Sequence, residues 1–205
     1  MLSIYLLRHA ETDYNAHNMY IGGRSNHIPL SREGEQQAII AGIFLNKQDF
    51  SFNKVFCSPA SRTRKTLEAI QNHCILSDNI TYSDDLQELS QGDWEGQLRS
   101  KIYTEEQLAE INSNQWLFKA PNGESQKDVE ERMLNFIHEN IFAQYSDGDF
   151  LIIGHGIAFK CLLRGILNIP SKMAFKLSIG NVSLTKLHYD QQQGWYLDYM
   201  NRQLA

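Results

Sequence analysis

The fold of this chain is decided by one stretch near its N-terminus, Tyr5-Leu6-Leu7-Arg8-His9-Ala10-Glu11-Thr12. Residues 4–7 are a continuous apolar run rich in strand formers, which is typical of a strand buried on both faces of a sheet. Arg8 and His9 follow it directly, so we expect a cation and an imidazole at the carboxyl edge of the sheet, where open α/β sheets bind ligands. Arginine offers a planar fork of donors to a phosphate or carboxylate, and a neutral imidazole can attack phosphorus or carry a proton. The alternative is that both residues only end a strand.

Beyond this stretch, predicted strands alternate with predicted helices. Strands are expected over 54–57, 80–86 and 150–153, helices over 32–46, 59–73, 126–145 and 157–167, and a closing hairpin over 182–189 and 195–200. This order predicts an α/β fold with a mostly parallel central sheet and helices on both faces. Residues 13–31 are expected to form a polar loop. The polar, weakly patterned residues 97–123 predict a small helical lobe inserted over the active site of a single domain, 1–205.

The composition is that of an ordinary globular protein, with 42% hydrophobic and 21% charged residues. The net charge of −5 argues against a nucleic-acid partner, so an anionic substrate would need a local cationic pocket. Three cysteines without metal-ligand spacing predict reduced core thiols and a cytoplasmic location. The first apolar run stops at Arg8, which argues against a signal peptide. No window approaches the ~20 apolar residues of a membrane span, so we expect no membrane contact.

A second histidine follows a predicted buried strand in Gly154-His155-Gly156. Because the ends of neighbouring strands meet at one edge of a sheet, we expect His155 to lie near His9. The flanking glycines let the backbone approach a ligand closely. Taken alone, His155 would more often be a core histidine with satisfied hydrogen bonds.

Two further segments supply a cation and a carboxyl group. Residues 58–66 follow a strand and open a helix, a geometry that favours anions, and Arg62 lies in the first turn. Glu88 begins a loop rich in turn formers, where a partly desolvated carboxyl group could act as a general acid. Without the other motifs Glu88 would be an ordinary loop glutamate.

Together these residues suit phosphoryl transfer through a covalent phosphohistidine. That reaction needs a nucleophile, cations around three phosphoryl oxygens and a proton donor for the leaving oxygen. No His-x-His or HExxH pattern and no acidic cluster accompanies the histidines, so we expect no metal and no cofactor.

These motifs make the sequence similar to the histidine phosphatase superfamily, also called phosphoglycerate mutase-like. The matching stretches, in chain order, are 7–12, Asn15, 23–31, 58–66, 88–96, 123–125, 155–156 and 181–185. Three positions depart from the family pattern: Ala10 replaces the glycine of Arg-His-Gly-Glu, Asn26 replaces an aspartate, and Ile28 lengthens the spacing to the next proline. The resemblance covers nearly the whole chain.

The resemblance implies a role for each matching residue. His9 would be the phosphorylated nucleophile, and Glu88 would protonate the leaving group and then activate water. The residues implied in holding phosphate or substrate are Arg8, Arg62, His155, Gly156, Asn15 and the backbone of Ile21 and Gly22. Lys160 stands where many relatives carry arginine.

The family contains phosphatases and mutases, and the loop over residues 92–96 resembles the phosphatase branch. Cofactor-dependent mutases tend to have a longer insertion and a C-terminal tail that shields phosphohistidine, whereas this chain stops at Ala205. We therefore expect hydrolysis of a small phosphorylated metabolite. A phosphoglycerate mutase is the alternative, and a non-catalytic binding module is a remote one. An edge strand could also pair two copies into a homodimer.

Overall fold

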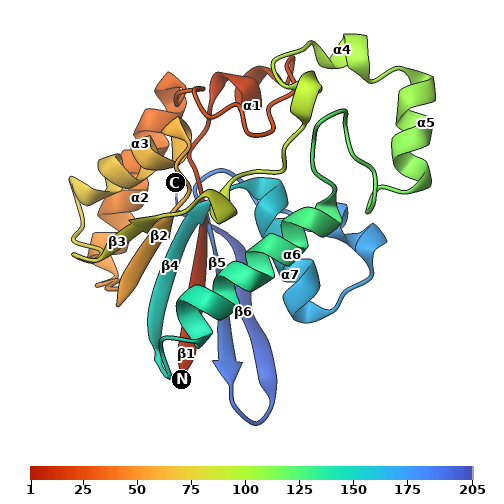
Figure 1. Ribbon diagram of the computed structural model, residues 1–205. Helices are drawn as coiled ribbons and strands as arrows, with labels where there is room; N and C mark the ends of the chain where they lie inside the picture. The colour runs from red at the N-terminus through yellow and green to blue at the C-terminus, as the bar shows by residue number, and fades with distance from the viewer. Residues whose placement is uncertain (205) are drawn as a thin grey trace.

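The computed structural model describes residues 1–204 and shows one six-stranded sheet with helices on both faces (Figure 1). The strand order is β3-β2-β4-β1-β5-β6. The strands are β1 (Leu2–Arg8), β2 (Lys54–Cys57), β3 (Ile80–Tyr82), β4 (Gly148–Gly154), β5 (Ser183–Asp190) and β6 (Gly194–Gln203). Strands β1 to β4 run parallel to one another. Strand β5 runs antiparallel to β1, and β6 runs antiparallel to β5. The predicted α/β fold and mostly parallel sheet are confirmed.

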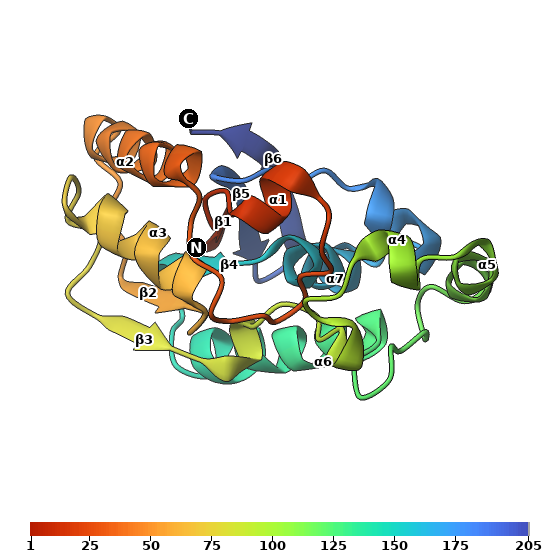
Figure 2. The same ribbon diagram turned by 90° about the horizontal axis from the view of Figure 1, so that it is seen from above.

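The helices lie in two layers and a lobe (Figure 2). They are α1 (Asp13–His17), α2 (Arg32–Lys47), α3 (Ser61–Gln71), α4 (Arg99–Ile102), α5 (Glu105–Ser113), α6 (Gln126–Ile137) and α7 (Gly156–Leu167). The pair α2 and α3 covers one face of the sheet, and the pair α6 and α7 covers the other. Helices α4 and α5 form the lobe, beyond α7. In the described part of the chain, no helix is long and apolar enough to cross a membrane.

Strand β1 shows why a continuous apolar run becomes a central strand. Successive side chains of a strand point to opposite faces, so both faces need apolar residues if helices cover both. Ile4 and Leu6 pack into the core beneath α6 and α7, whereas Tyr5 and Leu7 pack into the core beneath α2 and α3. These four side chains are buried, as the run predicts.

Two helix starts follow from local side-chain chemistry. The Ser31 hydroxyl accepts a hydrogen bond from the Gly34 N–H (3.0 Å) at the start of α2. At the start of α6, the Ser125 hydroxyl accepts from the Asp128 N–H (3.1 Å) and the Asp128 carboxylate accepts from the Ser125 N–H (2.8 Å). Both caps satisfy N–H groups that a helix leaves free at its beginning.

Three segments differ from the predicted elements. The strand predicted over 80–86 ends at Tyr82, because the Ser83 hydroxyl accepts from the Asp85 N–H (3.2 Å) and starts a single 3₁₀ turn. The loop predicted over 13–31 begins with α1, whose N-cap is Thr12. The helix predicted over 126–145 changes at residue 138 to a π-helical turn.

Candidate active site

The sheet brings the two histidines together through its register. Arg8 of β1 pairs with Gly154 of β4, so the residues that follow them, His9 and His155, emerge side by side. The His9 N–H donates to the Gly154 carbonyl (3.0 Å), and the two ring centroids lie 5.2 Å apart, edge to face. The predicted proximity of the two histidines is confirmed.

The His9 ring is buried and has a defined tautomer. Its Nδ1 lies 2.7 Å from the Ala10 carbonyl oxygen. Because a carbonyl can only accept, Nδ1 carries the proton and Nε2 keeps the lone pair. Burial, followed by the charges of Arg62 and Arg8, holds the pKa of His9 well below its ordinary value. The ring is therefore neutral at pH 7, the form that a nucleophile requires.

His155 is fully buried, and both of its ring nitrogens have protein partners. Arg62 donates from Nε to Nδ1 (3.2 Å), so Nε2 carries the proton and donates to the Ser58 hydroxyl (2.8 Å). Burial and the nearby charge of Arg62 lower the pKa of His155 well below its ordinary value. In this geometry His155 is a neutral acceptor that fixes the Arg62 guanidinium.

Arg62 also holds the loop that follows α1. Its Nη1 donates to the carbonyls of Arg24 (3.0 Å) and Ser25 (3.2 Å), and its Nη2 donates to the Gly23 carbonyl (3.1 Å). Burial lowers the pKa of Arg62 to about 10, which leaves the guanidinium charged at neutral pH. Arg62 thus adds a positive charge to the site, and one of its Nη2 N–H groups has no acceptor in the described part of the chain.

Arg8 has more unused donors than Arg62. Its Nη1 donates to the Ile179 carbonyl (2.7 Å), while its Nε is buried with no partner among residues 1–204. Burial lowers the pKa of Arg8, and the charge of Glu88 opposes this shift. Gly156 makes room for the guanidinium, because a Cβ at this position would lie 3.3 Å from Arg8 Nε. A buried donor without an acceptor is costly, so this arrangement indicates an anionic ligand.

The Glu88 side chain is held by backbone N–H groups at the start of α7. Its Oε2 accepts from Ile157 (3.0 Å), and its Oε1 accepts from Ala158 (2.9 Å) and from Leu89 (2.9 Å). The first turn of a helix has free N–H groups, which explains why a carboxylate fits there. Helix α7 therefore connects Gly156, beside Arg8, to Glu88.

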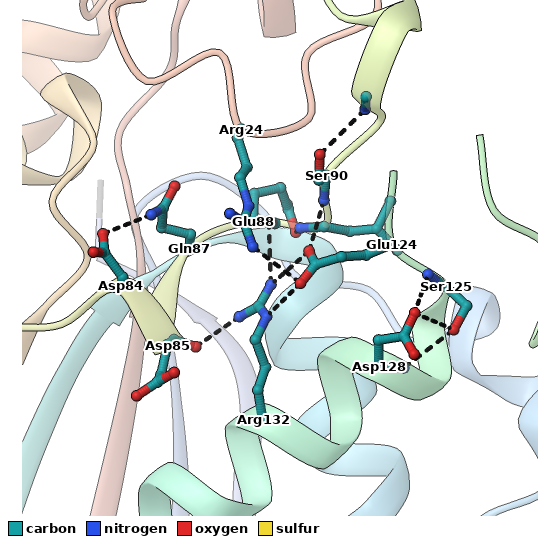
Figure 3. A network of polar contacts seen from close by, with 12 residues as sticks. Arg24, Asp84, Asp85, Gln87, Glu88, Ser90, Glu124, Ser125, Asp128 and Arg132 are labelled. Carbon is teal, nitrogen blue, oxygen red and sulfur yellow. Dashed lines mark hydrogen bonds and ion pairs between the residues drawn. The ribbon is translucent and has the colours of Figure 1, made fainter. Parts of the chain in front are cut away.

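The main chain around Glu88 is fixed from below by α6 (Figure 3). Arg132 donates to the carbonyls of Asp85 (2.6 Å) and Glu88 (3.2 Å), and it grips the Glu124 carboxylate with two hydrogen bonds (3.0 and 3.2 Å). Glu124 also accepts from the Ser90 N–H (2.9 Å) and from Arg24 (3.0 Å). This network therefore ties the main chain before Glu88, at Asp85, and after it, at Ser90, to α6.

Two cavities that share part of their lining lie at this site, and His155 lines neither of them. The smaller, of about 80 Å³, is lined by Arg8, His9, Arg62 and Glu88 among others. The larger, of about 510 Å³, shares Arg8 and Glu88 with it and extends under the lobe. The sizes suit a phosphoryl group in the first cavity and the rest of a substrate in the second.

The sequence also predicts that Asn15 and the backbone of Ile21 and Gly22 contact phosphate or substrate. Asn15 and Gly22 line both cavities. Asn15 Oδ1 accepts from the Thr12 N–H (3.2 Å), and its Nδ2 has no acceptor among the described residues. The Ile21 N–H donates to the Gln97 carbonyl (2.9 Å) and its carbonyl accepts from Gly96 (2.8 Å), while Ile21 lines the larger cavity. Contact of the Ile21 backbone with phosphate or substrate stays a prediction.

Three aromatic residues before and within the lobe both line the larger cavity and pack into a small apolar core. Trp94 lies 5.6 Å from Phe118 and 6.1 Å from Tyr103, between ring centroids, and all three line the larger cavity. They also form a small apolar core with Ile21. Trp116 lies elsewhere, beneath the guanidinium of Arg164.

Two functional neighbours were missed in the sequence. The Glu95 carboxylate accepts from the backbone N–H groups of Arg24, Ser25 and Gln91 (each 2.9 Å), so it shapes the loop that Arg62 holds. The helix predicted over 126–145 includes Arg132 but gives it no role. A glutamate just before Gly96, in a loop of turn formers, was the available signal for Glu95; no local signal marks Arg132.

Within residues 1–204, no group of three or more His, Cys, Asp or Glu side chains is arranged to hold a metal ion. The positive charges in the smaller cavity come from Arg8 and Arg62.

Comparison with known proteins assigns the family. The family model for the histidine phosphatase superfamily (branch 1) matches residues 4–203, so the chain belongs to this superfamily. It is 29% identical to the probable phosphoglycerate mutase GpmB of Salmonella choleraesuis, over 97% of this chain and 92% of that protein. It is 25% identical to the mycobacterial glucosyl-3-phosphoglycerate phosphatase, with a TM-score of 0.82 over 98% of this chain and 99% of that one. YhfR of Bacillus stearothermophilus shares the fold, with 23% identity and a TM-score of 0.82 over 98% of each chain.

Proposed function

We propose that this protein is a phosphomonoester hydrolase that acts on a small phosphorylated metabolite through a phosphohistidine at His9. The state of His9 carries the proposal: its Nδ1–H donates to Ala10, so the lone pair of Nε2 is available on a cavity that also holds Arg8, Arg62 and Glu88. The similarity to a glucosyl-3-phosphoglycerate phosphatase over nearly the full length of both chains supports hydrolysis.

In the first half-reaction, His9 Nε2 attacks phosphorus. A phosphorus–nitrogen bond forms while the bond from phosphorus to the alcohol oxygen breaks, and Glu88 gives its proton to that oxygen. The Ala10 carbonyl, which accepts from Nδ1–H, stabilises the positive charge that develops on the ring. The unpartnered N–H groups of Arg8 donate to the phosphoryl oxygens. These hydrogen bonds stabilise the negative charge on the oxygens strongly, because water is excluded from the site.

In the second half-reaction, water releases the phosphate. The Glu88 carboxylate takes a proton from water as the water oxygen attacks phosphorus, and the phosphorus–nitrogen bond breaks with its electron pair returning to His9. Inorganic phosphate leaves, and both side chains regain their starting protonation states. Arg62, fixed by His155 and by loop carbonyls, keeps its charge in place throughout.

A mutase is the second candidate, because the curated relative at 29% identity is named a probable phosphoglycerate mutase. The two activities share the first half-reaction and differ in what takes the phosphoryl group, either water or a hydroxyl group of an organic phosphate.

The test is phosphate release from a panel containing p-nitrophenyl phosphate, sugar phosphates and phosphoglycerates. We expect turnover by the wild type, none by His9→Ala, and normal turnover by His138→Ala, which changes an exposed histidine that lines neither cavity. Interconversion of 2- and 3-phosphoglycerate without phosphate release would establish the mutase instead. Turnover by His9→Ala equal to that of the wild type would refute the phosphohistidine.

A further inference from the structure

The turn that precedes β5 contacts the end of β1 at three points. Its Ile179 carbonyl accepts from Arg8 Nη1 (2.7 Å). The Val182 N–H donates to the Arg8 carbonyl (3.1 Å). The Asn181 side chain donates from Nδ2 to the His9 carbonyl (2.9 Å). The turn therefore holds both residues that meet the phosphoryl group in the proposed chemistry, although it has no part in that chemistry itself.

Val182 shows that this turn is tightly held. Its backbone lies in the left-handed region, with a φ of 51°. That conformation is unfavourable for a β-branched residue and persists only where the surrounding contacts enforce it. Val182 is fully buried, and its carbonyl accepts from the Leu204 N–H (3.2 Å). The neighbouring Asn181 thus extends from a fixed main chain.

Asn181 also joins α1 to the site. Its Nδ2 donates to Asn15 Oδ1 (3.3 Å), across 166 positions of the chain. Helix α1 buries no residue of its own. Among residues 1–204, the contact with Asn181 is the one hydrogen bond that links α1 to a segment outside residues 12–18. Asn181 is therefore the polar link that fixes α1 relative to His9.

The same contact determines which end of the Asn15 amide is left for a ligand. Asn15 Oδ1 accepts from the Thr12 N–H (3.2 Å), from the Thr12 hydroxyl (3.0 Å) and from Asn181 Nδ2. A backbone N–H can only donate, so the oxygen faces these protein donors and Nδ2 remains as a donor. Asn15 lines both cavities, whereas Asn181 lines neither. Any effect of Asn181 on the reaction must therefore pass through its neighbours.

We propose that Asn181 is a positioning residue of the active site. It holds the main chain of His9 in place and orients the Asn15 amide so that Asn15 Nδ2 donates to the phosphoryl group. The inference rests on the proposed function, because the phosphoryl group must occupy the smaller cavity, which both His9 and Asn15 line.

Inorganic phosphate tests the contact with Asn15, because it can occupy the smaller cavity without turnover. Calorimetric titration compares the wild type with Asn15→Ala, Asn181→Ala and the double variant. We expect each single substitution to weaken phosphate binding about three- to tenfold, the loss of one hydrogen bond. The double variant should bind phosphate as Asn15→Ala does, because Asn181 acts through Asn15. Losses that multiply in the double variant, or an Asn181→Ala variant that binds like the wild type, overturn the inference.

Turnover tests the contact with His9. In Asn181→Ala, kcat should fall about tenfold with p-nitrophenyl phosphate and with glycerol 3-phosphate alike, because the nucleophile is affected and the leaving-group proton is not. Asn181→Asp keeps the shape of the side chain but places an acceptor against the His9 carbonyl, so its loss should be larger. A decrease confined to glycerol 3-phosphate, or full activity of Asn181→Asp, would contradict the assignment.

Ser183→Ala is the matched control at the same turn. It removes the hydrogen bond from the Ser183 hydroxyl to the Gly180 carbonyl (2.7 Å), and in the described chain this hydroxyl makes no hydrogen bond to His9 or Asn15. Its kcat and its affinity for phosphate should stay within about twofold of the wild-type values. If Ser183→Ala loses as much as Asn181→Ala, the turn supports only the fold and the inference fails.

These measurements also separate this inference from the proposed function. If the wild type releases no phosphate from any ester, the hydrolase proposal fails, and the phosphate titrations alone decide the role of Asn181. If Asn181→Ala does not fold, NMR of the wild type decides it: added phosphate should shift the side-chain NH₂ signal of Asn15. An Asn15 signal that does not move at saturating phosphate would refute the role assigned to Asn181.

Discussion

Replacement of Arg132 by methionine tests whether α6 fixes the position of Glu88. The change keeps a long apolar stem but removes two hydrogen bonds to Glu124 and the bonds to the carbonyls of Asp85 and Glu88. The ion pair is largely buried, with 15% of the Arg132 side chain and 18% of the Glu124 side chain exposed. Breaking a buried pair costs about 3–5 kcal/mol. Since Glu124 keeps its bonds to Arg24 and Ser90, we expect a loss of about 2–3 kcal/mol in the free energy of unfolding.

Urea unfolding at neutral pH measures this loss, and Lys127→Met on the same helix is the control. Lys127 pairs with Glu131 at 3.6 Å, but both side chains are more than half exposed, so we expect a loss of only about 0.3–0.5 kcal/mol. Equal losses in the two variants would contradict the network as described.

The loss in Arg132→Met should also depend on pH with a defined sign. Burial alone would raise the pKa of Glu124, but the hydrogen bond and charge of Arg132 lower it overall. A carboxyl group with a lowered folded-state pKa stabilises the fold above its ordinary value of 4.5. That stabilisation disappears as the pH falls through the folded-state value. The difference between wild type and Arg132→Met should therefore shrink below pH 4.5 and not above it.

Catalysis gives a second readout of the same variant. An alkyl phosphate needs a proton on its leaving oxygen, whereas p-nitrophenolate leaves without one. If Arg132 positions Glu88, turnover of glycerol 3-phosphate should fall about tenfold more than turnover of p-nitrophenyl phosphate. A uniform decrease with both esters would show that Arg132 supports the fold without positioning Glu88.

Two further results are expected from the described geometry. Burial and the charges of Arg62 and Arg8 depress the pKa values of His9 and His155, so nitrogen NMR spectra should show both rings neutral from about pH 7.5 down to about 5.5. The same rings in urea-unfolded protein should titrate near 6.5. Charging of either ring in the folded state over this range would refute the burial argument. The lowered values also mean that both rings stabilise the fold above pH 6.5, and that this contribution is lost as the pH falls towards their folded-state values. Gly34→Ala should lower the free energy of unfolding in urea by at least about 2 kcal/mol, because the new Cβ would lie 2.0 Å from the Glu11 carbonyl oxygen. Gly22→Ala, whose Cβ would have no atom within 4 Å, should change it by less than about 0.5 kcal/mol. Similar effects of both substitutions would contradict the packing at Gly34.

The parts of the fold that the sequence predicts are those with local causes. Residues 54–57 form a strand as predicted because a short apolar run is bounded by Ser58-Pro59. The caps at Ser31 and Ser125 are likewise formed by residues three positions away. The five-residue helix α1 was missed because it buries no side chain and so has no apolar stripe.

The arrangement of the site is only partly local. Arg8 and His155 could be placed at one edge because each lies where a buried strand ends, and parallel strands end together. The acceptor for Arg8 is the carbonyl of Ile179, 171 residues away, and nothing in either segment predicts that contact. The hydrogen bond from Arg132 to the Glu88 carbonyl likewise depends on how α6 packs against the 3₁₀ turn at 84–86. The spacing of residues in the sequence does not predict this packing.

The pairing of Arg8 with Gly154 has a consequence for how the protein fluctuates. Strands β1 and β4 lie in the interior of the sheet with both faces covered, so their amide hydrogens can exchange with water only in openings close to complete unfolding. Helices α4 and α5 contain no buried residue and can separate from their neighbours at a small cost in free energy. A slowly exchanging strand, β1, and the rapidly exchanging lobe therefore border the same cavity. Loosening of the lobe can admit a ligand while His9 stays in a rigid frame.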